Sequence, residues 1–287
     1  MEPDTQGAGL RRHDLPDPAG AGEDAALAAR IREAIARDGP MPFSRFMDFA
    51  LYDPDGGYYR AAEARPGRGG DFVTAPELHP IFGQTLAQAV LETWERLGRP
   101  DPFVLSEHGA GVGALAAPLL GELATTPIAG TLRYHPIDID ARRVATLTGR
   151  LREAGLGHLL APEDRGTFTG MIVGNEILDT LPVHRVRQRG ERLVELAVAV
   201  GPDGDFAEVE IAPTTTDLAG RLAAEGITLV DGQTAEICLA LDDWLAAAVA
   251  PLRRGLVLLI DYGWPAVDLY DPVRRRDGTL RAYVRQS

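Results

Sequence analysis

The feature that most constrains the fold of this chain is a series of short apolar runs separated by helical stretches. Phe103–Leu105, GMIVG at Gly170–Gly174 and LVLLI at Leu256–Ile260 each have the length and composition of a strand buried on both faces. A further strand is expected to end near Asp138. Parallel strands covered by helices on both faces produce such runs. The sequence therefore predicts an α/β fold with a Rossmann-like parallel sheet. Residues 101–182 are expected to form the first part of its core.

Three strand-like runs interrupt this alternation. Short turns that contain glycine join them, which is typical of a β-meander. We expect a β-rich insertion over residues 183–232, followed by a helix from about Thr234 to Leu252 as residues 233–287 return to the core. The three runs are Val183–Arg187, Leu193–Val200 and Phe206–Ile211.

Two amphipathic stretches precede the strand pattern. Apolar residues recur every four positions from Leu27 to Ile35 and predict a helix that ends at Gly39-Pro40. A second short helix is expected directly after it. We interpret residues 1–22 as disordered, because they are rich in Gly, Pro, Asp and Ala, and residues 23–100 as an N-terminal helical segment.

Composition excludes several classes of function. The 287 residues carry a formal net charge of −13, whose field repels duplex nucleic acid, so no nucleic-acid partner is expected. All 29 basic residues are arginine, which excludes lysine-dependent chemistry such as a P-loop or a Schiff base. Cys238 is the only cysteine, so no intrachain disulfide forms. His79, His108, His135 and His184 lack the spacing of metal ligands, so no metal site is expected.

The location of the protein is also constrained by its sequence. No apolar run approaches the roughly 18 residues that a membrane span requires, so no membrane partner is expected. The first residues lack the apolar core of a secretory signal and are too acidic for a typical mitochondrial transit peptide. We therefore expect a cytoplasmic protein.

A glycine-rich turn follows the Phe103–Leu105 strand and opens a helix. Gly109, Gly111 and Gly113 let the backbone approach a ligand closely, and the helix N-terminus offers free N–H groups. Asp138 lies 29 residues after Gly109 at a strand end, where a carboxylate can accept hydrogen bonds from both ribose hydroxyls. The alternative is that the turn only packs a helix against the sheet.

Two details distinguish a methyltransferase loop from a dehydrogenase loop. The spacing is G-x-G-x-G, because Ala114 stands where the dinucleotide fingerprint has its third glycine. Glu107 also precedes the loop directly. A carboxylate there suits a cationic sulfonium cofactor or its amino group, whereas it would be misplaced beside a pyrophosphate.

Four longer motifs are similar to those of a known family. They are GGDFVTAPELHPIFGQTLA at 69–87, GNEILDTLPVHRV at 174–186, IDYG at 260–263 and GTLRAY at 278–283. Through them the chain resembles, from about Gly39 to Tyr283, the MidA-like family, whose mitochondrial members are protein arginine methyltransferases that assist respiratory complex I assembly. The resemblance implies a class I methyltransferase sheet that binds S-adenosyl-L-methionine. The family normally continues past the last motif, so we expect the final strands to be missing and the C-terminal segment to be truncated.

The resemblance also implies which residues form the site. Glu176 and Asp179 of the N-E-x-x-D motif are expected to be catalytic, and carboxylates at a strand-to-helix edge suit bidentate recognition of a guanidinium group. The alternative is that Glu176 caps the next helix and Asp179 lies on the surface. The residues expected to bind cofactor are Glu107, Gly109, Gly111, Gly113, Asp138 and Asn175, with Asp71 and Thr74 from a segment that folds over it.

The functional hypothesis is methyl transfer to arginine in a protein substrate. A respiratory-complex subunit is one candidate partner, and a homodimer is one candidate assembly. Two alternatives stay open: a methyltransferase for a small molecule, and a non-catalytic assembly or binding module that keeps the fold. The expected truncation favours the module, whereas the intact N-E-x-x-D motif and glycine loop argue against it.

Overall fold

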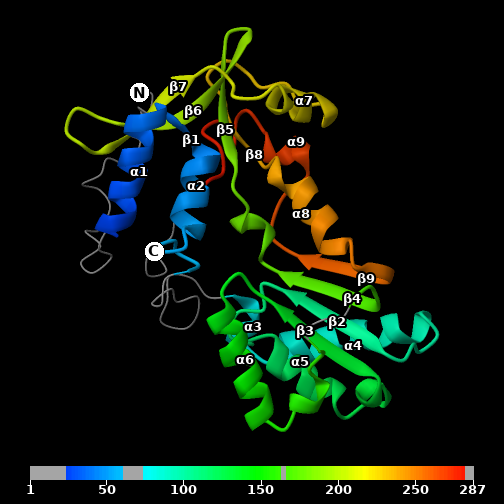
Figure 1. Ribbon diagram of the computed structural model, residues 1–287. Coiled ribbons are helices and arrows are strands. Elements are labelled where there is room, and N and C mark those ends of the chain that lie inside the picture. The colour runs from blue at the N-terminus through cyan, green and yellow to red at the C-terminus, as the bar shows by residue number, and fades with distance from the viewer. Residues whose placement is uncertain (1–23, 61–73, 163–165, 282–287) are drawn as a thin grey trace, which may run out of the picture.

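The computed structural model describes residues 24–60, 74–162 and 166–281 (Figure 1). The helices are α1 (Ala25–Asp38), α2 (Phe43–Tyr52), α3 (Ala75–Leu78), α4 (Ile81–Arg96), α5 (Ala116–Leu123), α6 (Ala141–Glu153), α7 (Asp217–Ala224), α8 (Ala240–Val249) and α9 (Ala266–Leu269). Short 3₁₀ helices are η2 (Pro127–Gly130), η3 (Gly157–Leu159) and η4 (Leu178–Thr180). The strands are β1 (Met41–Pro42), β2 (Phe103–His108), β3 (Leu132–Ile137), β4 (Phe168–Asn175), β5 (His184–Arg189), β6 (Arg192–Val200), β7 (Phe206–Ile211), β8 (Thr234–Ile237) and β9 (Leu252–Ile260).

The four apolar runs form one parallel sheet in the order β3-β2-β4-β9, which lies in the lower half of Figure 1. In its register Leu105 of β2 is opposite Tyr134 of β3 and Met171 of β4, and Met171 is opposite Leu256 of β9. The helices α4, α5 and α6 join these strands in one buried core. The predicted α/β fold with a Rossmann-like sheet is confirmed. The expectation that Leu256–Ile260 is buried on both faces is wrong: Leu256 is 44% exposed, because β9 is an edge strand with β4 as its only partner in this sheet among the described residues.

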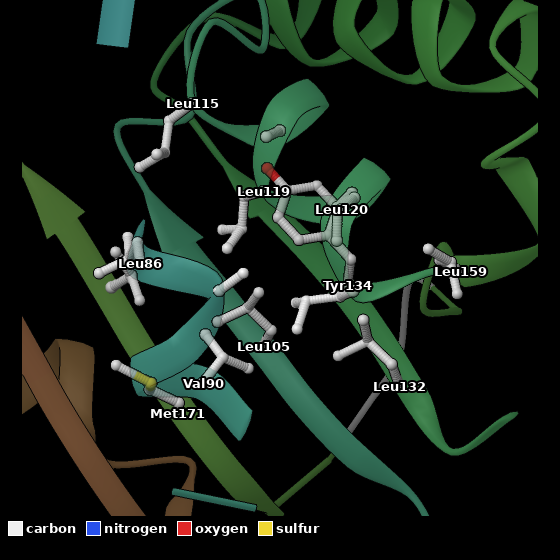
Figure 2. Close-up of a cluster of buried hydrophobic side chains, with 14 of the residues drawn as sticks. Leu86, Val90, Leu105, Leu115, Leu119, Leu120, Leu132, Tyr134, Leu159 and Met171 are labelled. Atoms are coloured by element: carbon white, nitrogen blue, oxygen red, sulfur yellow. The ribbon is translucent and has the colours of Figure 1, made fainter. Parts of the chain in front are cut away.

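The main core lies between this sheet and the helices α4 and α5. Figure 2 shows Leu86 and Val90 of α4 beside Leu105, with Leu119 and Leu120 of α5 on the same side of the sheet. All five side chains are buried. Burial of each such side chain stabilises the fold by about 1.5–3 kcal/mol, so the apolar runs fix the position of the sheet.

The predicted meander forms a second, antiparallel sheet around β6. β5 pairs with Arg192–Leu196 and β7 pairs with Glu195–Val200. The two residues of β1 pair with Ala197 and Val198, and β8 pairs with β5, so strands from outside residues 183–232 complete the sheet. Figure 1 shows it in the upper half, with α1 and α2 beside it.

The helix expected from about Thr234 to Leu252 is wrong at both ends. Thr234–Ile237 is the strand β8, which pairs antiparallel with residues 184–187 of β5. Helix α8 occupies only Ala240–Val249, and Leu252 already belongs to β9. The alanine-rich sequence favours helix locally, but the available edge of β5 gives Thr234–Ile237 backbone partners as a strand, and tertiary pairing overrides propensity.

The first predicted helix is confirmed with its caps. The Asp24 carboxylate accepts hydrogen bonds from the N–H groups of Ala26 and Leu27 at the start of α1. At its end Gly39 has a φ of 87°, and its N–H donates to the Ile35 carbonyl. Within the described ranges, no helix is long and apolar enough to cross a membrane.

Candidate active site

The predicted site residues follow strands that end at the same edge of the parallel sheet. His108 at the end of β2 is opposite Ile137 of β3 and Gly174 of β4. Asn175 at the end of β4 is opposite Ile260 at the end of β9. The segments after all four strands therefore begin side by side. Open α/β sheets bind ligands at this carboxyl edge.

The glycine loop has three left-handed residues, with φ values of 68° at Gly109, 53° at Gly111 and 90° at Gly113. A Cβ atom on Gly109 would lie 3.1 Å from Ile177 Cδ1, and one on Gly113 would lie 3.1 Å from Leu147 Cγ. These two glycines therefore let the loop pack closely on the protein. A Cβ atom on Gly111 would meet only the Gly109 carbonyl oxygen, at 4.0 Å. Gly111 is thus the point of the loop that a ligand can approach.

Asp138 lies directly against this loop. Its Oδ2 accepts a hydrogen bond from the Gly111 N–H at 2.9 Å, and its Oδ1 accepts one from the Asp140 N–H at 3.0 Å. A carboxylate has about four acceptor positions, so Asp138 retains capacity for a ligand. Asp140 is buried and caps α6, where its carboxylate accepts the Arg142 N–H and forms an ion pair with the Arg142 guanidinium. Asp140 is therefore the weaker candidate for a ligand contact.

Glu107 lies beneath the loop instead of on its open side. Its side chain is buried, and its Oε2 accepts a hydrogen bond from the Tyr134 hydroxyl at 2.7 Å. Burial raises the pKa of Glu107 to about 7, and the charge of Asp138 adds to this effect. The Tyr134 hydrogen bond opposes it but does not offset it. Glu107 thus supports the loop from the core, and its carboxylate titrates close to neutral pH.

Stability is expected to depend on pH through Glu107. Its folded pKa of about 7 exceeds the ordinary value of 4.5, so between these pH values the folded state retains a proton that the unfolded state has lost. This contribution is complete below pH 4.5 and is lost as the pH rises to about 7, with a slope of up to about 1.4 kcal/mol per pH unit. Denaturant unfolding of wild type and Glu107→Gln from pH 4 to 8 measures the difference. Parallel curves for the two proteins would contradict this role.

Glu176 follows β4 in a left-handed conformation, with a φ of 48° that is uncommon outside glycine. Its N–H donates to the Ile260 carbonyl at 2.8 Å. Its carboxylate accepts hydrogen bonds from the Ala75 N–H and from the side chain of Asn175. Burial raises the pKa of Glu176, and repulsion by Asp179 adds to it. Backbone strain of this kind persists where the surroundings fix it, and it is concentrated at functional sites.

The segment that carries Thr74 meets the N-E-x-x-D motif. Thr74 caps α3 through a capping box, in which its N–H donates to Glu77 Oε2 at 3.2 Å. Ala75 is the first residue of α3 and donates its N–H to Glu176. The predicted cofactor-covering segment and the predicted catalytic motif are therefore in contact. Asp71 lies outside the described residues.

Asp179 faces the residues that follow β9. The Tyr262 hydroxyl donates a short hydrogen bond to Asp179 Oδ2. Asp261 accepts hydrogen bonds from the N–H groups of Leu178 and Tyr262, at 2.8 and 2.9 Å. Burial raises the pKa of Asp179, and the charge of Asp261 adds to this effect. With Glu176, these carboxylates form a negatively charged centre suited to a cationic group.

Two other kinds of site are not supported. No group of three or more His, Cys, Asp and Glu side chains within residues 24–60, 74–162 and 166–281 has an arrangement for a metal ion. His184 contacts Ser44 Oγ at 3.4 Å and Glu195 Oε1 at 2.7 Å, but both contacts are made by Nδ1. A nucleophile relay uses both ring nitrogens, so this trio fixes α2 to the antiparallel sheet and is not a hydrolase triad.

Sequence reasoning missed Tyr134 and the link between Ala75 and Glu176. Tyr134 is opposite Leu105 in the parallel register, which places it diagonally next to Glu107. An aromatic residue with a hydroxyl in a predicted buried strand indicates that a polar partner is needed. The contact between Ala75 and Glu176 had no such signal, since 101 positions separate the two residues.

The chain is similar in sequence and in structure to known proteins. Residues 85–287 match the family model described as "Putative S-adenosyl-L-methionine-dependent methyltransferase". A protein from Burkholderia thailandensis, whose crystal structure contains S-adenosyl-homocysteine, is 36% identical to this chain. The likeness covers 91% of this chain and 68% of that protein, with a TM-score of 0.79.

Curated relatives carry the name of a protein arginine methyltransferase. The chain is 28% identical over 186 residues to the mitochondrial "Protein arginine methyltransferase NDUFAF7 homolog" of Drosophila melanogaster, covering 56% of this chain and 42% of that protein. It is 25% identical over 228 residues to the Mus musculus protein, covering 70% of this chain and 52% of that one. The chain thus spans about half the length of these relatives.

Proposed function

The chain belongs to the S-adenosyl-L-methionine-dependent methyltransferase family that its residues 85–287 match, and from this premise we propose that it methylates arginine side chains of a protein. The observation that carries the proposal is the carboxylate centre of Glu176, Asp179 and Asp261, at the same sheet edge as the glycine loop. A planar guanidinium group pairs with carboxylates through two parallel hydrogen bonds. The names of the curated relatives support the same substrate class.

The residues around the loop fit S-adenosyl-L-methionine. Gly111 leaves open space above its backbone, and the Asp138 carboxylate beside it keeps acceptor capacity. Asn175 Oδ1 is buried and has no hydrogen-bond partner among the described residues, so it is available to a donor on the cofactor. When bound, the cofactor supplies an electrophilic methyl group on a positively charged sulfur. Gly111, Asp138 and Asn175 would hold it.

The carboxylates would then act on the acceptor. Glu176 and Asp179 bind and orient the guanidinium group so that one nitrogen points toward the cofactor, and such positioning provides most of the rate acceleration. The Tyr262 hydroxyl fixes the orientation of Asp179. The Ala75 N–H does the same for Glu176.

Replacing Asp138 with alanine is expected to weaken cofactor binding by about 1.5–3 kcal/mol, the range for hydrogen bonds to a charged group. Calorimetry with S-adenosyl-homocysteine and with an analogue that lacks both ribose hydroxyls separates two causes. If Asp138 binds the ribose, wild type prefers the hydroxylated ligand and the variant does not. If Asp138 acts only by holding the Gly111 N–H, the variant loses the same factor of affinity for both ligands. Unchanged affinity for both ligands would exclude Asp138 from the cofactor site.

The proposed reaction is tested by methyl transfer from labelled S-adenosyl-L-methionine. A protein mixture and a metabolite extract are offered in parallel, and hydrolysed products are examined for methylarginine. Label in protein arginine supports the proposal, and label only in small molecules supports the alternative methyltransferase. Cofactor binding without transfer to either would favour the binding module. A respiratory-complex subunit as substrate, a homodimer and a cytoplasmic location remain predictions.

A further inference from the structure

A cavity with a mainly basic lining lies on the segment that follows the carboxylate centre in the chain. Its volume is about 380 Å³, and three of its six lining residues are arginines. Asp268 also lines the cavity, so three arginines and one aspartate give the lining a formal charge of +2 in a chain with a net charge of −13. The lining residues are Trp264, Asp268, Arg274, Arg275, Gly278 and Arg281.

The three arginines retain unused hydrogen-bonding capacity. Among the described residues none of them has an ion-pair partner, whereas arginines of β5 are paired with glutamates of β7. Arg275 lies over the Trp264 ring at 5.0 Å, and Arg281 donates to the Leu280 carbonyl at 2.8 Å. The nearby Asp271 carboxylate accepts the backbone N–H groups of Val273 and Arg274. A guanidinium group has five donors, so the cavity suits an anion such as a carboxylate.

The segment that carries the arginines is anchored. Thr279 donates its N–H and its hydroxyl to Glu236 Oε2 of β8, at 2.7 and 3.1 Å. Thr234 of β8 donates its N–H to the Arg276 carbonyl at 2.8 Å. Figure 1 shows α9 close to β8 and α8. The basic cavity is therefore held on the edge of the antiparallel sheet by backbone and side-chain contacts.

The cavity is connected to the carboxylate centre through the chain, because Trp264 follows Tyr262 by two residues. Consecutive Cα atoms are about 3.8 Å apart, so the two Cα atoms are separated by at most about 7.6 Å. Tyr262 contacts Asp179, and Trp264 lines the cavity. The carboxylate centre and the cavity are therefore carried by neighbouring parts of the same segment.

We propose that the cavity binds an acidic side chain, Asp or Glu, of the protein substrate that presents the acceptor arginine. This inference rests on the proposed function and specifies its substrate class. A substrate that carries both a cation and an anion complements the carboxylate centre and the basic cavity. Electrostatic complementarity of this kind selects partners and fixes their register.

The test measures peptide binding and does not depend on turnover. Fluorescent peptides in matched pairs carry one Arg and, at a series of spacings from it, either Glu or Gln, and anisotropy is recorded with and without S-adenosyl-homocysteine. Wild type is expected to bind the Glu peptide at least about fivefold more tightly, since a desolvated charge pair contributes about 1 kcal/mol or more. Arg274→Gln and Arg275→Gln should each reduce this preference to less than about twofold. Arg276→Gln is the matched control, because Arg276 does not line the cavity and bonds to the Asp231 carbonyl.

The outcomes separate the two proposals. Equal binding of both peptides, no binding, or an undiminished preference in both cavity variants overturns the acidic-residue site. Competition by inorganic phosphate at the same concentration as the peptide also overturns it, because the cavity would then be a general anion site. Calorimetry with S-adenosyl-homocysteine tests the methyltransferase function independently. If the protein binds this ligand but shows no preference for the Glu peptide, the proposed function stands and the acidic-residue site is excluded.

Discussion

Glu176→Gln is expected to reduce methyl transfer about a hundred- to a thousandfold while S-adenosyl-L-methionine affinity stays within about threefold of wild type. Glutamine has the same shape, and its side-chain oxygen can still accept the Ala75 N–H. It lacks the negative charge that pairs with a guanidinium group. The loss should therefore fall on turnover and not on cofactor binding. Initial rates with labelled cofactor and calorimetry on the same preparations measure the two quantities.

The matched control is Glu153→Gln, which removes a carboxylate from an exposed position on α6 and should leave both quantities unchanged. The raised pKa values of Glu176 and Asp179 also predict that wild-type activity declines on acidification at a higher pH than ordinary carboxyl groups would give. Full turnover of the Gln variant would exclude the carboxylate mechanism. Collapse of cofactor binding would instead assign Glu176 to the cofactor pocket.

Gly111→Val is expected to weaken S-adenosyl-L-methionine binding more than about a hundredfold, which corresponds to about 2.7 kcal/mol. The branched side chain would enter the open space above the loop, where only the Gly109 carbonyl lies within reach of a Cβ atom. The fold should persist, because no packed side chain is displaced. The left-handed φ of 53° adds a strain of about 1–3 kcal/mol to the folded state.

Gly190→Val separates this strain from loss of the ligand site. Gly190 has a φ of 56° in the turn between β5 and β6, and a Cβ atom there meets no atom within 4 Å. The two variants should lose similar amounts of unfolding free energy, but only Gly111→Val should lose cofactor affinity. Equal loss of affinity in both would attribute the effect to stability. Wild-type affinity in Gly111→Val would place the cofactor elsewhere.

The sequence by itself predicted the parallel strands and the glycine-rich turn, because each of them shows as a pattern of neighbouring residues. Apolar runs such as GMIVG predicted the parallel strands, because a strand buried on both faces needs apolar side chains at every position. The spacing of Gly109, Gly111 and Gly113 predicted a ligand-binding turn, and all three residues adopt positive φ values. The order of these strands in the sheet, β3-β2-β4-β9, was not predicted by these patterns and is known only from the tertiary structure.

Contacts between distant residues were decided only by the tertiary structure. Thr234–Ile237 is a strand because β5 offers an edge, and Met41 joins β6 although more than 150 positions separate them. Glu176 is fixed by the N–H of Ala75, and Glu107 by the hydroxyl of Tyr134. Periodicity reports whether a residue is buried but not which residue covers it. The sequence by itself therefore specified the parallel strands, the glycine loop and the carboxylates, and tertiary packing decided the strand β8, the partners that orient these groups and their pKa values.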